Sequence, residues 1–169
     1  MTQEIVAIRG GVTSTEALQV FRSVCGGGTP FVRRRLYYPY FWFRLRYRAR
    51  TLLGETALQV SCLVDARTRV ASTSDRFALE RVEAGDGDVV EPRLAEDEAR
   101  GIAERYVAYV VKNRTKALVA PDRDVVDREL IRKPFWIVEC VKRPDRSILV
   151  DGVTGRFHPL SLEREALPS

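Results

Sequence analysis

The residues with the most distinctive chemistry lie between positions 33 and 50, in the stretch RRRLYYPYFWFRLRYRAR. This stretch combines arginines with aromatic side chains and contains no acid. From Tyr40 onward, polar and apolar residues alternate, and a period of two is typical of a β-strand. One face of such a strand carries Phe41, Phe43, Leu45, Tyr47 and Ala49. The other face carries Tyr40, Trp42, Arg44, Arg46, Arg48 and Arg50.

The second face has the composition of a polyanion-binding surface. Four arginines at alternate positions repel one another unless anions meet them. Arginine beside tyrosine and tryptophan on a sheet face is used for single-stranded nucleic acid, because rings stack on bases and guanidinium groups hold phosphates. Two other interpretations stay open. The charges solvate an edge hairpin and discourage aggregation, or they face acids of this chain or of a second subunit.

The distribution of charge along the chain points to the same segment. The formal net charge is +5, and residues 31–54 alone hold seven arginines and no acid, so the rest sums to 5 minus 7, or −2. Residues 80–98 have the opposite character, with eight acids and two arginines, a local charge of −6. This acidic segment is a candidate internal partner for the arginines.

No combination of residues predicts catalysis or a metal site. The stretch CGGGTP at 25–30 lacks the Gly-Lys-Ser or Gly-Lys-Thr that a phosphate-binding P-loop requires. His158 is the only histidine, and with Cys140 it makes no recognisable pair of base and nucleophile. The remaining cysteines, Cys25 and Cys62, complete no CxxC spacing that would indicate zinc or a disulfide framework. We therefore expect a protein that is not an enzyme and has no cofactor.

Several features indicate a cytoplasmic protein. The N-terminal sequence MTQEIVAIRGGVTSTEA has neither the basic start nor the apolar core of a signal peptide. No run approaches the roughly 18 apolar residues that a membrane span requires. The two-residue period and Pro39 also disfavour a membrane-surface helix in the arginine-rich stretch. Scattered cysteines suit a reducing compartment.

The chain contains the same unit twice. FVRRRLYYPYFW at 31–42 aligns without gaps with VVDRELIRKPFW at 125–136, and the five identities include both Phe-Trp pairs. LVDARTR at 63–69 aligns with LVDGVTG at 149–155. Because the order is the same in both halves, the sequence predicts two copies of one supersecondary unit.

The repeat also predicts which residues are equivalent. The distance along the chain from Phe41 to Asp65 exceeds that from Phe135 to Asp151 by eight residues. An even difference keeps every side chain of a longer hairpin on its own face, so Phe41 is expected to superpose on Phe135 and Asp65 on Asp151. Each aspartate is expected to begin a turn and to accept backbone N–H bonds, which is a structural role.

A helix is expected before the strands of each half. Thr13 and Glu16 have capping-box spacing ahead of an apolar stripe that ends at the CGGGTP stretch. The second helix begins with the acids at 96–98 and ends near basic residues at 112–116, which suits the helix macrodipole. The expected strands are 32–37, 40–50, 56–64, 125–131, 135–142 and 147–151.

These elements predict an α+β fold of two tandem α-β-β-β repeats, each with its helix packed on its own antiparallel sheet. The expected domains are a first repeat with a long basic hairpin at 1–79, an acidic connector at 80–93 and a second repeat at 94–169.

The second half combines a helix that carries a Glu-Ala pair, two strands and the turn LVDGVTGRF at 149–157. This combination resembles the PepSY domain and, more loosely, cystatin-like α+β folds. The resemblance covers residues 94–157 and extends faintly to 13–71, where the first copy reads VDARTR without the glycine. It implies a helix on an antiparallel sheet, and a role in restraining peptidases or in sensing at membranes. Members of that family are typically extracytoplasmic, whereas this sequence shows no export signal.

The expected function is a non-enzymatic binding or regulatory module with an unknown protein partner. The first alternative is binding of single-stranded nucleic acid or another polyanion through the face from Tyr40 to Arg50. The second alternative is PepSY-like regulation of a peptidase. Assembly of several copies stays open.

Overall fold

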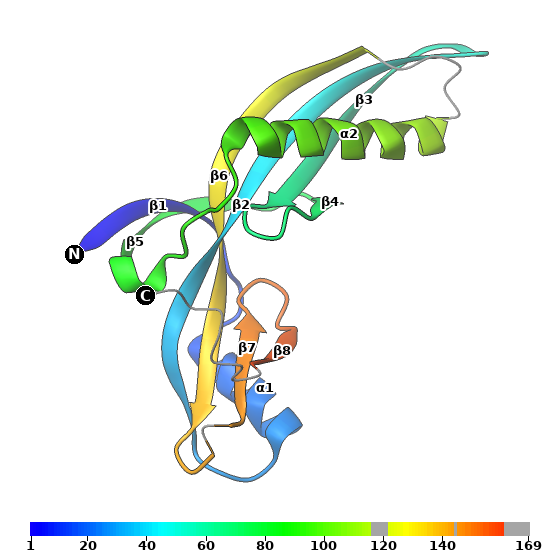
Figure 1. Ribbon diagram of the computed structural model, residues 1–169. Coiled ribbons are helices and arrows are strands. Elements are labelled where there is room, and N and C mark those ends of the chain that lie inside the picture. The colour runs from blue at the N-terminus through cyan, green and yellow to red at the C-terminus, as the bar shows by residue number, and fades with distance from the viewer. Residues whose placement is uncertain (116–121, 144, 161–169) are drawn as a thin grey trace. The chain divides into compact units, whose positions relative to one another are not determined.

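The computed structural model describes residues 1–115, 122–143 and 145–160, and this part of the chain is mostly β (Figure 1). Its elements in chain order are β1 (Thr2–Ile8), α1 (Ser14–Cys25), β2 (Pro30–Thr51), β3 (Gly54–Asp65), β4 (Ala71–Thr73), β5 (Leu79–Gly85), a short 3-10 helix (Asp86–Asp88), α2 (Glu96–Thr115), β6 (Asp122–Cys140), β7 (Ser147–Asp151) and β8 (Phe157–Leu160). The strands form one hydrogen-bonded sheet in the order β4-β3-β2-β6-β1-β5, with β7 pairing with β6 and with β8.

The chain divides into two compact units. Unit 1 consists of residues Met1–Tyr38, Leu79–Val90 and Arg132–Ser169, and unit 2 consists of Pro39–Ala78 and Glu91–Ile131. The strands β2 and β6 run through both units, because β2 crosses the boundary between Tyr38 and Pro39 and β6 crosses it between Ile131 and Arg132. Each unit is therefore built from parts of both halves of the sequence.

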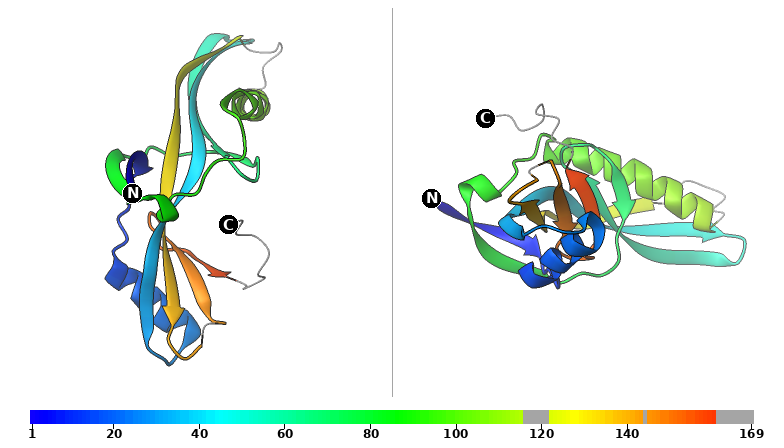
Figure 2. Two further views of the ribbon diagram at one scale, coloured as in Figure 1. Left: turned by 60° about the vertical axis from the view of Figure 1, so that its left-hand side comes forward. Right: turned by 90° about the horizontal axis from the view of Figure 1, so that it is seen from below.

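The core of unit 2 lies between α2 and one face of the sheet (Figure 2). The helix contributes small side chains four residues apart, and this spacing places them on a single face. These helix residues are Ala99, Ala103, Val107 and Val111. They pack against Phe41, Phe43, Leu45 and Tyr47 of β2 and Cys62 and Val64 of β3. Burial of these apolar side chains holds α2 on the sheet.

Unit 1 has two smaller cores. Helix α1 begins with a capping box, in which the backbone N–H of Thr13 donates to the Glu16 carboxylate at 2.7 Å and the Thr13 hydroxyl accepts from the Glu16 N–H at 3.2 Å. The first core contains Ala17 and Phe21 of α1 with Val138, Cys140, Ile148 and Val150. The second core contains Ile5, Ala7, Tyr37, Ala84 and Val89, where β1 pairs antiparallel with β5.

The predicted fold class of two tandem helix-on-sheet repeats was wrong. The order of one helix and three strands does recur, as α1-β2-β3-β4 and α2-β6-β7-β8. However, α1 contacts β7, and α2 contacts β3 and β4, so the helix of each half packs on the hairpin of the other half. The physical reason is that β2 and β6 do not break where the sequence suggested. They continue through Pro39 and Pro134 as strands of 22 and 19 residues.

The segment 80–93, which was predicted to be an acidic connector, carries most of β5 and the 3-10 helix. All seven residues of β5 pair with β1, from Leu79 opposite Ile8 to Gly85 opposite Thr2. Its side chains at Val82 and Ala84 contribute to the second core of unit 1. Among its acids, Glu83 is exposed on β5, and Asp86 and Asp88 lie in the 3-10 helix.

The repeated aspartates occupy the same kind of turn in both halves. In the first, the Asp65 Oδ1 accepts from the backbone N–H of Arg67 at 2.8 Å and of Thr68 at 2.9 Å. In the second, the Asp151 Oδ1 accepts from Val153 at 2.8 Å and Thr154 at 3.1 Å. The predicted structural role of both aspartates is confirmed.

Each turn closes on a residue with a left-handed backbone. The φ angles are 68° at Arg69 and 73° at Gly155. Glycine adopts this conformation freely, whereas an arginine does so at some cost in strain. The first copy thus keeps the geometry of the turn without the glycine that the second copy has.

The register shows that the predicted match of Phe41 with Phe135 is displaced by one residue. Asp65 lies opposite Tyr40, whereas Asp151 lies opposite Phe135. The carbonyl oxygens of the two buried prolines mark the true equivalence, because Pro39 accepts from Ala66 N–H and Pro134 accepts from Gly152 N–H. The Phe-Trp pair therefore faces opposite ways in the two copies. Phe41 lies in the unit 2 core, whereas its structural counterpart Trp136 packs against the unit 1 core.

The exchange of hairpins predicts how fragments of the chain behave. A fragment of residues 1–79 contains the β2–β3 hairpin but not α2, so Phe41, Phe43 and Leu45 lose the helix that covers them. We expect this fragment and the fragment 80–169 each to lack cooperative thermal unfolding and near-ultraviolet circular dichroism. Both signals are expected to return when the two fragments are mixed or produced together. A cooperative, monomeric transition from either fragment alone would contradict the arrangement.

The ion pair of Asp151 predicts a dependence of stability on pH. Burial alone would raise the pKa of Asp151, but the hydrogen bond from Lys133 at 2.6 Å and the N–H groups of Val153 and Thr154 outweigh it and lower the pKa below 3.8. Because the folded pKa lies below the unfolded one, the stabilisation is complete above the unfolded pKa and is lost as pH falls through the folded pKa. We expect Asp151→Asn to cost roughly 2 to 3 kcal/mol at neutral pH.

Urea unfolding of the wild type and Asp151→Asn between neutral pH and pH 3 would measure this effect. The difference in unfolding free energy is expected to shrink below about pH 4, where the unfolded carboxyl group takes up its proton. Asp75→Asn, at an exposed aspartate of unit 2, is the matched control and should change little. A difference for Asp151→Asn that stays constant with pH would contradict the assignment.

Candidate polyanion-binding face

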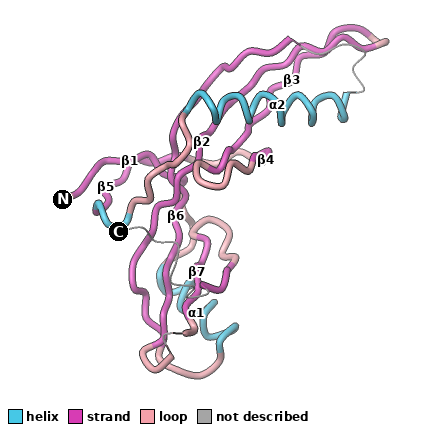
Figure 3. The backbone as a smooth tube through the Cα atoms, viewed as in Figure 1, coloured by secondary structure: helices cyan, strands magenta, loops and turns pink. Residues whose placement is uncertain are grey.

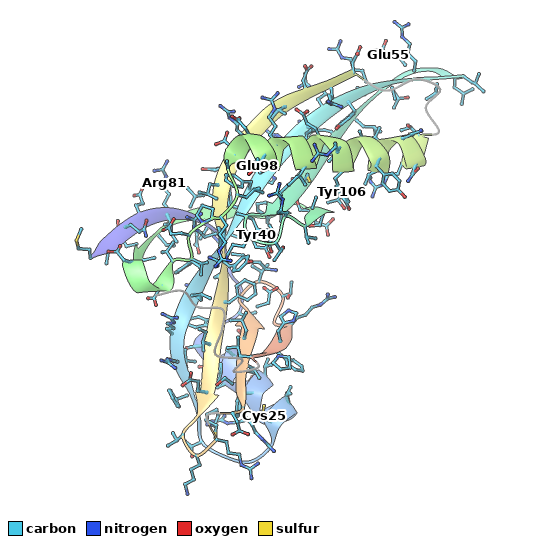
Figure 4. All side chains as sticks on the ribbon, viewed as in Figure 1. Cys25, Tyr40, Glu55, Arg81, Glu98 and Tyr106 are labelled. Carbon is cyan, nitrogen blue, oxygen red and sulfur yellow. The ribbon has the colours of Figure 1, made fainter. Side chains whose placement is uncertain are left out.

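The structure places the six predicted site residues at alternate positions on one face of β2, within unit 2. Tyr40, at one end of this series, is labelled in Figure 4. Phe41, Phe43, Leu45, Tyr47 and Ala49 are each 5% exposed or less and face α2. The side chains between them point away from the helix. The predicted alternation is therefore confirmed. We call this surface the arginine face; it consists of Tyr40, Trp42, Arg44, Arg46, Arg48 and Arg50.

The aromatic end of the arginine face is packed against its neighbours. The Trp42 Nε1–H donates to the Ser61 hydroxyl on β3 at 2.5 Å, and the ring of Phe77 meets the indole edge-on with centroids 5.8 Å apart. The guanidinium group of Arg44 lies 5.9 Å from the centre of the same indole ring. Trp42 is partly buried as a result. These contacts fix the orientation of the ring and cover part of its surface.

Arg44 is the first arginine of the face and has a partner within unit 2. Its Nη2 lies 3.0 Å from the Asp127 carboxylate on β6. Its Nε is buried without a hydrogen-bond partner in the described part of the chain. The charge of Arg44 is therefore largely committed to the sheet itself.

Arg46, Arg48 and Arg50 differ from Arg44 because they are exposed and form no ion pair with any described residue. The residues opposite them on β3 are Gln59, Ala57 and Glu55, so Arg50 alone has an acid across the strand pair. No hydrogen bond joins Arg50 and Glu55 in the described structure. Arg46, Arg48 and Arg50 thus stand in a row on one face of β2 without an ion pair to a described residue, and β6, the other neighbouring strand, carries Asp122 and Asp124 at its start.

The acidic segment at 80–98 supplies no ion pair to Arg46, Arg48 or Arg50 within the described residues, and five of its eight acids pair with other groups. In unit 2, Glu96 lies 3.1 Å from Arg128 and Glu98 lies 3.1 Å from Arg69. In unit 1, four of the observed pairs are Glu80 with Arg9, Asp88 with Arg34, Asp86 with the N-terminal amine and Glu4 with Arg81. These acids therefore pair within the chain, but with groups other than Arg46, Arg48 and Arg50.

The three arginines that open the basic stretch belong to unit 1 and have partners there. Arg33 lies 2.7 Å from the Glu139 carboxylate, and Arg34 donates to the carbonyl of Gly87 at 2.7 Å. The guanidinium group of Arg35 lies over the ring of Trp136 at 5.0 Å. The local charge of +7 in the sequence is thus divided between arginines with structural contacts and Arg46, Arg48 and Arg50, which pair with no described residue.

The sequence candidates for catalysis are not brought together into a site. Cys140 is buried in the core under α1, whereas His158 is exposed on β8. Cys62 is also buried, and burial raises the pKa of its thiol to about 12, so it stays protonated. Among residues 1–115, 122–143 and 145–160, no group of three or more His, Cys, Asp and Glu side chains is placed to hold a metal ion.

Two residues that the sequence analysis missed lie at the end of the hairpin. Leu52 and Leu53 form the two-residue connection between β2 and β3, and they are 89% and 100% exposed. The available signal was a pair of leucines just before a glycine in a stretch of strong alternation. Asp127 and Phe77, which engage Arg44 and Trp42, could not be found from local sequence because they are distant in the chain.

Comparison of the chain with known proteins found no similar protein. No family model matches the chain, no curated protein is similar to it and no solved structure is similar to it. The resemblance to PepSY and cystatin-like domains therefore stays a prediction. Within the described residues, neither helix is long and apolar enough to cross a membrane.

The charge pattern of the face predicts the stability of its variants. Arg46→Gln/Arg48→Gln removes repulsion and breaks no contact, so its unfolding free energy should be within about 0.5 kcal/mol of the wild type. At low salt the variant should be slightly more stable, because repulsion is then least screened. Arg44→Gln should cost about 1 kcal/mol, as for an exposed ion pair. Urea unfolding at low and high salt measures both. A large loss in the double variant would mean that these arginines are structural.

Proposed function

We propose that this chain is a non-enzymatic binding module whose arginine face takes a ligand with several anionic groups in a row. The observation that carries the proposal is the set of three exposed arginines on one face of β2 that form no ion pair with any residue the structure describes. A cluster of like charges costs stability, and a bound anion removes that cost. Several acids of the segment 80–98 are engaged with other arginines, among them Glu80, Glu96 and Glu98.

The spacing of the arginines supports an extended ligand. Side chains two residues apart on one face of a strand lie about 7 Å from each other, so the three guanidinium groups span about 14 Å. A single small anion cannot meet all three, whereas a polymer or a surface with repeated phosphate groups can. Guanidinium groups suit phosphate because they donate two parallel hydrogen bonds. An acidic region of a partner protein presents similar chemistry with carboxylates.

Single-stranded nucleic acid is the polymer that the aromatic end of the face favours. Tyr40 and Trp42 lie on the same side of β2 as the arginines, which is the arrangement in which bases stack while phosphates are held. The indole already contacts Phe77 and Arg44, so stacking on it requires the exposed part of the ring. Its fluorescence reports directly on such contact.

We also infer a reducing, cytoplasmic environment. The support is that Cys25, Cys62 and Cys140 are all free thiols and that two of them are buried in separate cores. Buried free cysteines act as small apolar side chains and need no oxidising compartment.

The binding proposal is tested by titrating the full chain with labelled single-stranded DNA and with heparin at several salt concentrations. We expect binding that weakens steeply with salt, because phosphate contacts release counterions. Arg46→Gln/Arg48→Gln should weaken binding to DNA and reduce the slope of log affinity against log salt by about 0.7 for each lost contact. Quenching of Trp42 would show that a base reaches the ring.

The matched control is Arg105→Gln/Arg114→Gln, which removes two exposed arginines from α2, on the other side of the sheet. The net charge of this control equals that of Arg46→Gln/Arg48→Gln. Comparing the affinities of the two variants for DNA therefore distinguishes a local binding site from attraction by net charge alone. Equal losses in the two variants would mean that net charge alone attracts the probe. The proposal fails if the wild type binds no anionic probe of any kind at low salt.

A further inference from the structure

The tight connection between β2 and β3 is a loop in the backbone trace (Figure 3). It consists of Leu52 and Leu53, whose side chains are exposed to solvent. The Thr51 hydroxyl donates to the Gly54 carbonyl at 2.9 Å and accepts from the Leu53 N–H at 3.2 Å. Gly54 has a φ of 120°, a conformation that favours glycine. Thr51 thus ties the connection together, and the hairpin extends past the end of α2, which leaves the leucines away from the unit 2 core.

The side chains of the arginine face change character in a fixed order toward this tip. Trp42 is packed and Arg44 is paired with Asp127. Arg46, Arg48 and Arg50 then follow without ion-pair partners, and the exposed Leu52 and Leu53 come last. Arg46, Arg48 and Arg50 therefore lie next to the exposed leucines. The packed ring of Trp42 lies toward the other end of the face.

We propose that this hairpin inserts Leu52 and Leu53 into the surface of a membrane rich in anionic lipids while Arg46, Arg48 and Arg50 bind the lipid phosphates. The proposal rests on the binding role of the arginine face and names its ligand. An apolar tip followed by a band of arginines matches the order of a bilayer surface, in which acyl chains lie below phosphate groups. Insertion removes both leucines from water, and the anionic surface attracts each arginine within a Debye length.

Charge complementarity distinguishes this ligand from nucleic acid. Between Arg44 and Gln59 the hairpin carries four arginines and one acid, Glu55, a net charge of +3. Nucleic acid would use the arginines but has no apolar layer to receive Leu52 and Leu53. A bilayer uses both groups and does not require the packed face of Trp42. Two leucines alone give weak attachment, and the basic residues supply the second signal that stable surface binding needs.

The test measures co-sedimentation of the full chain with vesicles of phosphatidylcholine alone and with added phosphatidylserine. We expect binding to the vesicles that contain phosphatidylserine. Leu52→Ser/Leu53→Ser should reduce that binding on the order of tenfold or more, since two exposed leucines lose their burial in the bilayer. The same variant should bind single-stranded DNA and heparin as the wild type does, because its arginines are intact. Val70→Ser/Val141→Ser, at two exposed valines elsewhere, is the matched control and should bind vesicles normally.

A tryptophan reporter tests insertion itself. Leu53→Trp should shift its fluorescence to shorter wavelength with anionic vesicles and be quenched by lipids brominated on the acyl chains. Vesicle binding that is unchanged by the leucine substitutions, or a reporter without shift or quenching, would overturn insertion while leaving an anion-binding face. Binding to DNA and heparin but not to vesicles would do the same and identify nucleic acid as the better ligand. No binding to any anionic probe would overturn both proposals. If the wild type self-associates but does not bind vesicles, and Leu52→Ser/Leu53→Ser abolishes the self-association, the hairpin tip instead contacts a second copy of the chain.

Discussion

The fold depends on the continuity of β2 and β6 through a buried proline in each strand. Proline lacks the N–H that a ladder needs and is usually confined to edges and irregular positions. Here the carbonyl oxygens of Pro39 and Pro134 are used instead, because each accepts a hydrogen bond from the residue after a turn aspartate. β2 enters unit 2 at Pro39, and β6 enters unit 1 at Arg132, two residues before Pro134. Each of the three cores therefore contains residues from both halves of the sequence.

The same constraint determines what the arginine face is free to do. Helix α2, which follows β3 and β4 in the chain, covers the odd-numbered side of β2 and leaves the even-numbered side without a covering helix. The pairing of Tyr40 through Thr51 with β3 holds the arginines at regular spacing. The β2–β3 hairpin is consequently a stiff support, and the side chains on it lose little conformational freedom of the backbone when a ligand binds. A flexible arginine-rich tail would pay that entropic cost on binding.

Much of the local structure could be predicted from the sequence, whereas the partners of each element could not. Alternation from Tyr40 to Arg50 gave the buried and open faces of β2, and the capping box gave the start of α1 at the residue after Thr13. These are local signals, since side-chain period and capping depend on neighbours in the chain. Which of the two hairpins α2 packs on depends on contacts between residues far apart in the sequence. The composition of the two hairpins does not distinguish between them. The sequence repeat led to a wrong prediction of the register, because the two Phe-Trp pairs match in sequence but face opposite sides of their strands.

The order of side chains along β2 gives the strongest reason to assign a binding role to charges that cost stability. Several arginines of unit 2 form ion pairs, as with Arg44 and Asp127, Arg128 and Glu96 and Arg69 and Glu98. Arg46, Arg48 and Arg50 form none with a described residue, and they occupy successive positions of one strand face next to two exposed leucines. Solubility alone would be served by mixed charges and by polar residues in the turn. Repulsion among neighbouring arginines and exposure of apolar side chains to water each cost free energy, and one anionic, partly apolar surface would reduce both costs.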